Sequence, residues 1–146
     1  MTRMPTNWRY RVYWEHTDAG GVVYHSRYLN FMERARSDWL LALGFPQTEL
    51  RQHESCLFVV TSVHLDFHQP ARLEDELAVD VAVEQLRAAS MRIAQRVKRV
   101  GGELLATGQV SVACVNAATF RPTRIPKTLH NAIQKFEQER VAHANH

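Results

Sequence analysis

The spacing of apolar residues changes along the chain and predicts which segments are strands and which are helices. Residues 8–15 follow a short tail (residues 1–7) and are rich in Tyr, Val and Trp, which predicts a first strand. From Arg27 to Leu43 the apolar period is near 3.6, which predicts a long helix with Ser26 at its N-cap and Gly44 at its end. Apolar residues cover so much of this helix that we expect other structure to wrap it.

The rest of the chain predicts mainly strands. After a polar link at residues 47–55, no helical period returns until Pro126, which suits the first turn of a C-terminal helix reaching about residue 146. The short links between the strands require antiparallel pairing. We therefore expect a single α+β domain spanning residues 1–146, with an antiparallel sheet of about five strands wrapped around one long central helix. The remaining predicted strands are residues 57–68, 76–86, 91–100 and 103–116, the last two joined by a hairpin at Gly101-Gly102.

Composition excludes several classes of protein. The chain has 146 residues, 45% of them hydrophobic, so it is long enough to bury a core without disulfides. We expect Cys56 and Cys114, both in apolar runs, to be buried reduced thiols. No apolar run is long enough to cross a bilayer and the first residues lack a signal-peptide stretch, so the expected location is the cytoplasm, without membrane insertion. The net charge of +3 is small, and the charged residues of opposite sign are interleaved along the chain. The charge therefore does not indicate a nucleic-acid partner.

One glycine-containing segment carries candidate chemistry. Asp18 lies in the turn-like stretch 16–21, and the long helix begins a few residues later. The first amides of a helix lack intrahelical acceptors and carry the positive end of its dipole, so they can hold a carbonyl oxygen that becomes negative during acyl transfer. A nearby carboxylate could attack that carbonyl or take a proton from water. From spacing alone, turn formation is the favoured explanation for an Asp in a glycine loop.

The residues around this loop resemble a known family. From Asp18 to Arg36 the sequence has the form D-A-G-G-V-V-Y-H-x-x-Y-x-x-F-x-E-R-A-R. This segment is similar to the signature of the 4-hydroxybenzoyl-CoA thioesterase family, and in particular to its tol-pal-associated acyl-CoA thioesterase branch. The likeness extends more loosely through residues 63–67, 70–75 and 121–122, and covers about residues 8–126.

The resemblance implies a fold, an activity and a site. It implies the hotdog fold, and hydrolysis of an acyl-coenzyme A thioester by a homodimer or tetramer with its active site between two subunits. The family's catalytic carboxylate falls on Asp18, as nucleophile or as general base. The amide that polarises the carbonyl falls on His25 or its neighbours, and the His25 side chain is a second candidate, with a purely structural role as the alternative. No cofactor is implied, because coenzyme A is part of the substrate.

Other residues are candidates for binding the substrate. Coenzyme A carries phosphates, and a loop after the last strand can reach a neighbouring subunit's ligand, which favours Arg121 and Arg124. The acyl group itself is not predicted, because aromatic and aliphatic chains both suit an apolar pocket. The candidates around it are Tyr24, Ser26, Tyr28, Phe58 and Val60.

Three alternatives remain open from the sequence. His64, Asp66 and His68 share one face of a predicted strand and could bind zinc, but a polar sheet face at a subunit contact is the favoured interpretation, so we predict no metal. A hotdog acyl-thioester dehydratase would need a different catalytic pair and would yield a different product. A non-enzymatic acyl-CoA binding or scaffold protein would bind acyl-CoA without releasing thiol.

Overall fold

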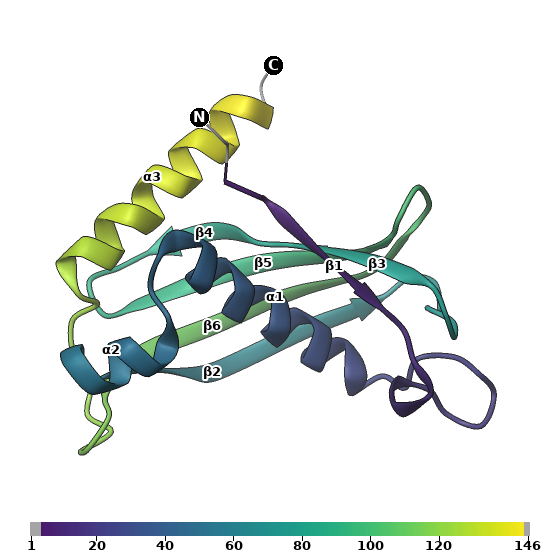
Figure 1. Cartoon of the computed structure of the whole chain (residues 1–146), viewed down its shortest axis with the longest axis horizontal. Helices are drawn as coiled ribbons and strands as arrows, with labels where there is room; N and C mark the ends of the chain where they lie inside the picture. Colours follow the sequence, from purple (N-terminus) through teal and green to yellow (C-terminus); the bar gives the residue numbers. More distant parts are fainter. Residues whose placement is uncertain (1–3, 145–146) are drawn as a thin grey trace.

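The computed structural model describes residues 4–144, which form one layer of sheet against helices (Figure 1). The fold is α+β, with an antiparallel sheet around a long helix, as the sequence predicts. Its elements in chain order are β1 (Asn7–Arg11), a 3-10 turn η1 (Trp14–His16), α1 (Arg27–Leu43), α2 (Gln47–Glu54), β2 (Cys56–Phe67), β3 (Glu76–Asp80), β4 (Ala82–Leu86), β5 (Ser90–Arg99), β6 (Leu104–Asn116) and α3 (Lys127–Ala144).

The sheet has six strands, one more than the pattern predicts. The order is β1-β3-β5-β6-β2, with β4 also paired to β5, so the predicted strand 76–86 is two strands. Side chains interrupt the ladder at the break: the Asp80 carboxylate accepts the Arg96 amide, and the Gln95 amide group donates to the Asp80 carbonyl. The Val81 amide turns instead to the Thr6 carbonyl at 3.2 Å.

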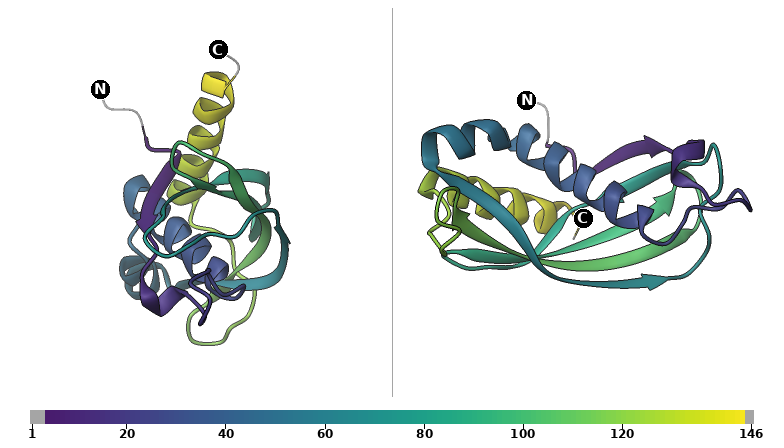
Figure 2. Two further views of the ribbon diagram at one scale, coloured as in Figure 1. Left: turned by 90° about the vertical axis from the view of Figure 1, so that its right-hand side faces the viewer. Right: turned by 90° about the horizontal axis from the view of Figure 1, so that it is seen from below.

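Helix α1 lies in the concave side of the curved sheet, as Figure 2 shows from below. Phe31, Met32 and Ala35 on its inner face are fully buried. Its outer face is not wrapped within one chain, because Leu29 and Leu41 are 38% and 56% exposed. The sheet therefore wraps the inner face of the helix, as predicted, and the outer face stays partly exposed in the single chain. The helix ends as predicted at Gly44, whose φ of 94° is left-handed.

Helix α3 crosses one end of the sheet and closes the core there (Figure 1). Its apolar stripe, Leu129, Ile133 and Phe136, is buried, and the Phe136 ring contacts the edge of Trp39 at 5.7 Å between centroids. Within residues 4–144, no helix is long and apolar enough to cross a membrane.

Several predicted boundaries need correction. The first strand ends at Arg11, since the chain then turns into η1 rather than extending to residue 15. The predicted tail is ordered from Met4, which packs on the core, while residues 1–3 lie outside the described part, as do residues 145–146 of the predicted C-terminal helix. The polar link is a helix, α2. Its signals are charge rather than apolar period: Glu49 lies in its first turn and Arg51 in its last, which suits the helix dipole.

The two cysteines are free and buried, as predicted, and the fold brings them together. Cys56 begins β2 and Cys114 lies in the neighbouring β6, with their sulfur atoms 2.9 Å apart. The hydrogen bond with Cys56, and then burial, raise the pKa of the Cys114 thiol, whereas the same contact lowers the pKa of Cys56. The Cys114 thiol is therefore unsuited to act as a nucleophile at neutral pH.

Candidate active site

Asp18 lies in a small hairpin at the N-terminal end of α1. Thr17 and Val23 form an antiparallel bridge, and the Asp18 amide donates to the Val22 carbonyl at 2.9 Å. One carboxylate oxygen, Oδ1, accepts the Gly20 amide at 2.8 Å, which is the turn role that the sequence leaves open. The other oxygen, Oδ2, has no hydrogen-bond partner within residues 4–144. Asp18 therefore serves the turn and still presents a free carboxylate oxygen at the surface.

The glycines explain why the loop takes this shape. Gly21 has a φ of 76°, a left-handed conformation that other residues rarely adopt. A Cβ at Gly20 would lie 3.3 Å from Asp18 Oδ1, closer than most such contacts. Both positions therefore favour glycine, and the loop holds the carboxylate in place without covering it.

The start of α1 leaves backbone amides unpaired beside this loop. The Arg27 amide donates to the Tyr24 carbonyl at 2.8 Å, but in the described part of the chain the amides of His25 and Ser26 have no acceptor. Ser26 is at the predicted N-cap, yet its backbone is already helical (φ −69°, ψ −19°) and its hydroxyl caps no amide. The first turn holds no acidic residue. This terminus is therefore free to bind a developing negative charge.

Two predicted residues beside the amides are exposed. The rings of Tyr24 and His25 lie against each other with centroids 4.2 Å apart, and Tyr24 is 48% exposed. Tyr28 is different: it is buried, and its hydroxyl accepts the Ala71 amide at 3.0 Å. Tyr28 therefore has a structural bond beneath the loop, and its contact with substrate stays a prediction.

A buried residue that the sequence pattern does not reveal lies directly under the loop. His16 is only 4% exposed, and its ring packs on Phe31 of α1 at 4.6 Å between centroids. A histidine in a glycine-containing, turn-like stretch gives no signal of burial, because such stretches are usually exposed. Its burial comes from tertiary contact with α1.

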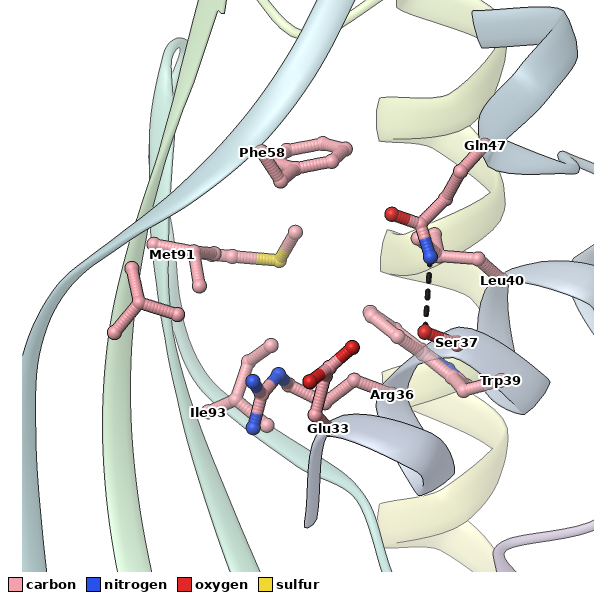
Figure 3. Close-up of a pocket in the computed structure, with 11 residues that line it drawn as sticks. Glu33, Arg36, Ser37, Trp39, Leu40, Gln47, Phe58, Met91 and Ile93 are labelled. Atoms are coloured by element: carbon pink, nitrogen blue, oxygen red, sulfur yellow. Dashed lines mark hydrogen bonds between the residues drawn. The ribbon is translucent and has the colours of Figure 1, made fainter. Parts of the chain in front are cut away.

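Phe58 and Val60 line a cavity of about 220 Å³ between α1, α2 and the sheet (Figure 3). Part of its wall is apolar and is formed by Leu40 of α1 and by Phe58, Met91 and Ile93 of the sheet. Polar groups also line it: the Gln47 side chain donates to Ser37 at 2.9 Å, and Glu33 and Arg36 lie beside Ile93. The sequence predicts Phe58 and Val60 as pocket residues but not the polar residues of this cavity, because their spacing is that of an ordinary exposed helix face.

The cavity and Asp18 occupy different parts of one chain. The cavity begins at Glu33 and extends along the later part of α1, whereas Asp18 lies before its start. Arg121 and Arg124 are exposed in the loop after β6, which lies by the end of α2, since the Ala117 amide bonds to the Ser55 carbonyl. The structure therefore places Asp18, Tyr24, His25, Ser26 and Tyr28 around one end of α1 and separates them from Phe58, Val60, Arg121 and Arg124.

The strand residues considered as a zinc site do not converge. His64 contacts Asp66 at 3.2 Å, while His68 contacts Thr107 at 3.2 Å. In the part of the chain that the structure describes, no group of three or more His, Cys, Asp or Glu residues could hold a metal ion.

This fold and loop define a class of enzymes that act on thioesters, and comparison with known proteins identifies the family. Residues 12–133 match the model of the Thioesterase-like superfamily. The acyl-CoA thioesterase YbgC of Haemophilus influenzae is 41% identical over 127 residues, covering 87% of this chain and 93% of that protein. The chain belongs to the thioesterase-like superfamily and is an enzyme of that family, which confirms the resemblance seen in the sequence.

Solved structures support the same assignment. A probable thioesterase from Bartonella henselae is 34% identical, with a TM-score of 0.78 over 82% of this chain and 98% of that one. A 1,4-dihydroxy-2-naphthoyl-CoA thioesterase from Synechocystis has a TM-score of 0.82 over 88% of this chain and 95% of that one, at 22% identity. The latter likeness concerns the fold alone. The predicted hotdog fold is confirmed.

Proposed function

We propose that this protein hydrolyses the thioester of acyl-coenzyme A, with Asp18 and the amides that begin α1 as its catalytic groups. The observation that carries the proposal is that residues 18–26 contain two kinds of free group: the Oδ2 oxygen of Asp18, and the amides of His25 and Ser26, which have no acceptor within residues 4–144. Acyl transfer needs a carboxylate that attacks the carbonyl or activates water, together with a site that binds the oxyanion. The acyl-CoA activity of the Haemophilus influenzae relative supports the choice of substrate.

The chemistry needs few groups. The amides bind the carbonyl oxygen as it becomes negative, and the carbon–sulfur bond breaks to release the coenzyme A thiolate. A thiol with a pKa of roughly 8.5 leaves without strong help from an acid. Asp18 acts by one of two routes: its carboxylate attacks the carbonyl to give an anhydride that water then opens, or it takes a proton from the water that attacks. Both give free acid and coenzyme A.

We propose a homo-oligomer in which β2 pairs with β2 of a second copy. β2 is an edge strand, and Val60, Val63 and Phe67 on it are 49%, 42% and 51% exposed. Exposed apolar edges are normally covered. If β2 pairs antiparallel with itself across a two-fold axis near its centre, the Phe67 end of one strand meets the Phe58 end of the other. Phe67 contacts Tyr28, near the catalytic loop, at 5.3 Å between ring centroids.

This pairing would unite the separated candidates. It brings the Asp18 loop of one copy toward the cavity of the other, so the cavity becomes the site of the acyl group. Its volume of about 220 Å³ suits a short chain or a single ring, since a cavity of about 150 Å³ holds benzene. The exposed Arg121 and Arg124 of a neighbouring copy are then our candidates for the coenzyme A phosphates.

A panel of acyl-CoA substrates with free-thiol titration tests the function. We expect thiol release, fastest with short-chain or single-ring acyl groups and slow with long chains. Binding of acyl-CoA without thiol release would instead support the scaffold alternative. Hydration or dehydration of the acyl chain with the thioester intact would support the dehydratase alternative.

A further inference from the structure

His16 is a buried histidine that the proposed chemistry does not use. It lies two residues before Asp18 and, unlike the exposed residues around it, is 4% exposed. Histidines of a surface loop are usually solvated, and burying one without a bonding role costs free energy. The contacts of His16 indicate what its burial does for the loop.

The contacts of His16 tie together the chain on both sides of the catalytic loop. The ring nitrogen Nδ1 accepts the Tyr13 amide at 2.9 Å, the reach-back bond of a capping box. The His16 carbonyl accepts the Tyr24 amide at 3.1 Å, and the residue after Tyr24 is His25. The ring rests on Phe31 of α1. His16 thus contacts the segment before Asp18, the segment after it and helix α1.

The hydrogen bond from the Tyr13 amide to Nδ1 requires the neutral imidazole. Nδ1 can accept the Tyr13 amide only while it carries no proton, which places the ring proton on Nε2. Protonation would direct a second N–H at the Tyr13 N–H and break the bond.

The surroundings also favour the neutral form. Burial is the main cause that lowers the pKa of His16 below its ordinary value, and Arg27 and Arg34 of α1 lower it further. Glu15 and the backbone hydrogen bond at Tyr13 raise the pKa, and the Glu15 carboxylate is 3.9 Å from Nε2 with its side chain 73% exposed to water.

We propose that neutral His16 is a positioning residue, which holds the Asp18 loop against the first turn of α1 and releases it when protonated. This inference rests on the proposed function, because it takes Asp18 as the catalytic group. It predicts that the enzyme loses activity on acidification because protonated His16 releases the loop.

Thermodynamic linkage gives the direction in which pH changes the hold of His16 on the loop. The released histidine has a pKa near 6.5 and the held one a lower value, so the released loop binds the proton more readily. The hold is therefore complete above about pH 6.5 and weakens as the pH falls through the lower value.

Two variants separate the bond from the ring. His16→Gln keeps an acceptor for the Tyr13 amide without a group that titrates, whereas His16→Leu removes the acceptor. At about pH 8 we expect His16→Leu to lower kcat by about tenfold or more with a smaller change in KM, because a misplaced catalytic group impairs chemistry more than binding. His16→Gln should stay within about threefold of wild type, and the acid fall of its kcat should begin at lower pH than in wild type.

Equal kcat values for the Gln and Leu variants at about pH 8 would overturn the proposal, as would a Gln variant with the acid profile of wild type. Amide hydrogen exchange across residues 13–24 supplies a measurement that does not need activity. The Leu variant should exchange faster there than the Gln variant and wild type, and equal exchange would also overturn the inference. If this order holds but wild type releases no thiol from acyl-CoA, the proposed function fails and the structural role of His16 stands.

Should the Leu variant fail to fold, the wild-type protein still tests the inference. NMR titration of its imidazoles should show His16 neutral down to a pH below about 6.5, with the Tyr24 amide shifting at the same midpoint. A His16 that titrates at its ordinary value, without any change at Tyr24, would contradict it.

Discussion

The proposed site at the start of α1 combines backbone amides with the carboxylate of Asp18. The unpaired amides of His25 and Ser26 face solvent at the helix start, and Asp18 presents one free oxygen. The His25 ring lies tilted against the Tyr24 ring and has no hydrogen bond in the described part of the chain. The backbone of His25, rather than its imidazole, is therefore the expected catalytic contribution.

Replacing His25 by alanine tests this division. The substitution keeps the amide and removes the ring, so we expect kcat to fall by about tenfold or less, against about a hundredfold or more for loss of the Asp18 carboxylate. Steady-state thiol release from the preferred acyl-CoA measures both. A loss with His25→Ala as complete as that with Asp18→Asn would show that the imidazole takes part directly.

At the scale of elements, α1 sits close to the sheet because β6 has no side chain at Gly108. A Cβ there would overlap the Met32 thioether and lie 3.0 Å from a methyl of Leu65. Met32 is fully buried and has little room to move away. The close approach of helix and sheet thus depends on this glycine.

Gly108→Ala should therefore destabilise the protein by about 1–3 kcal/mol through overpacking. Urea unfolding followed by circular dichroism measures the change. Gly102→Ala is the matched control, because a Cβ there meets Arg99 at an ordinary 3.5 Å and should cost little. Equal stability of the two variants would show that α1 can shift without cost.

The elements also show what the sequence could and could not predict. The helical period of α1 and the alternation of the strands predicted the helix and the antiparallel sheet, and the resemblance of residues 18–36 to a known family implied the hotdog fold. The break between β3 and β4 was missed because it depends on Asp80 and Gln95 bonding across the sheet, which no local pattern reveals. The short helix α2 was missed because it buries only Leu50. At the site, the loop and Asp18 were predictable from the motif, whereas the burial of His16 depends on distant contacts.

At the scale of the whole molecule, the single chain leaves its apolar rim uncovered. The sheet covers one side of helix α1 (Figure 2). Val60, Val63 and Phe67 stay exposed along the edge strand β2. Asp18 lies before the start of α1, whereas the cavity lies along the later part of that helix. Pairing of two copies through β2 accounts for the exposed rim and the divided site together.

Val63→Arg should disrupt this pairing, because it places charge in an apolar contact. We expect a smaller species by analytical ultracentrifugation and a loss of activity of about tenfold or more. Val141→Arg is the control: Val141 is 43% exposed, close to the 42% of Val63, but lies on α3. A Val63→Arg protein with the assembly and activity of wild type would contradict pairing through β2.

The most direct test of the catalytic account is Asp18→Asn. The amide keeps the shape of the carboxylate and its acceptor oxygen for the Gly20 amide, so folding and substrate binding should persist. It can neither attack a carbonyl as an anion nor take a proton from water at neutral pH, and either role contributes about 10²–10⁴ in rate.

The measurement is the rate of coenzyme A release from the preferred acyl-CoA at about pH 8, with Glu15→Gln as a control for the loss of one charge in the same loop. We expect Asp18→Asn to be at least about a hundredfold slower than wild type and Glu15→Gln to stay within a few-fold. Hydrolysis by Asp18→Asn within a few-fold of the wild-type rate would contradict the assignment of Asp18 as the catalytic carboxylate.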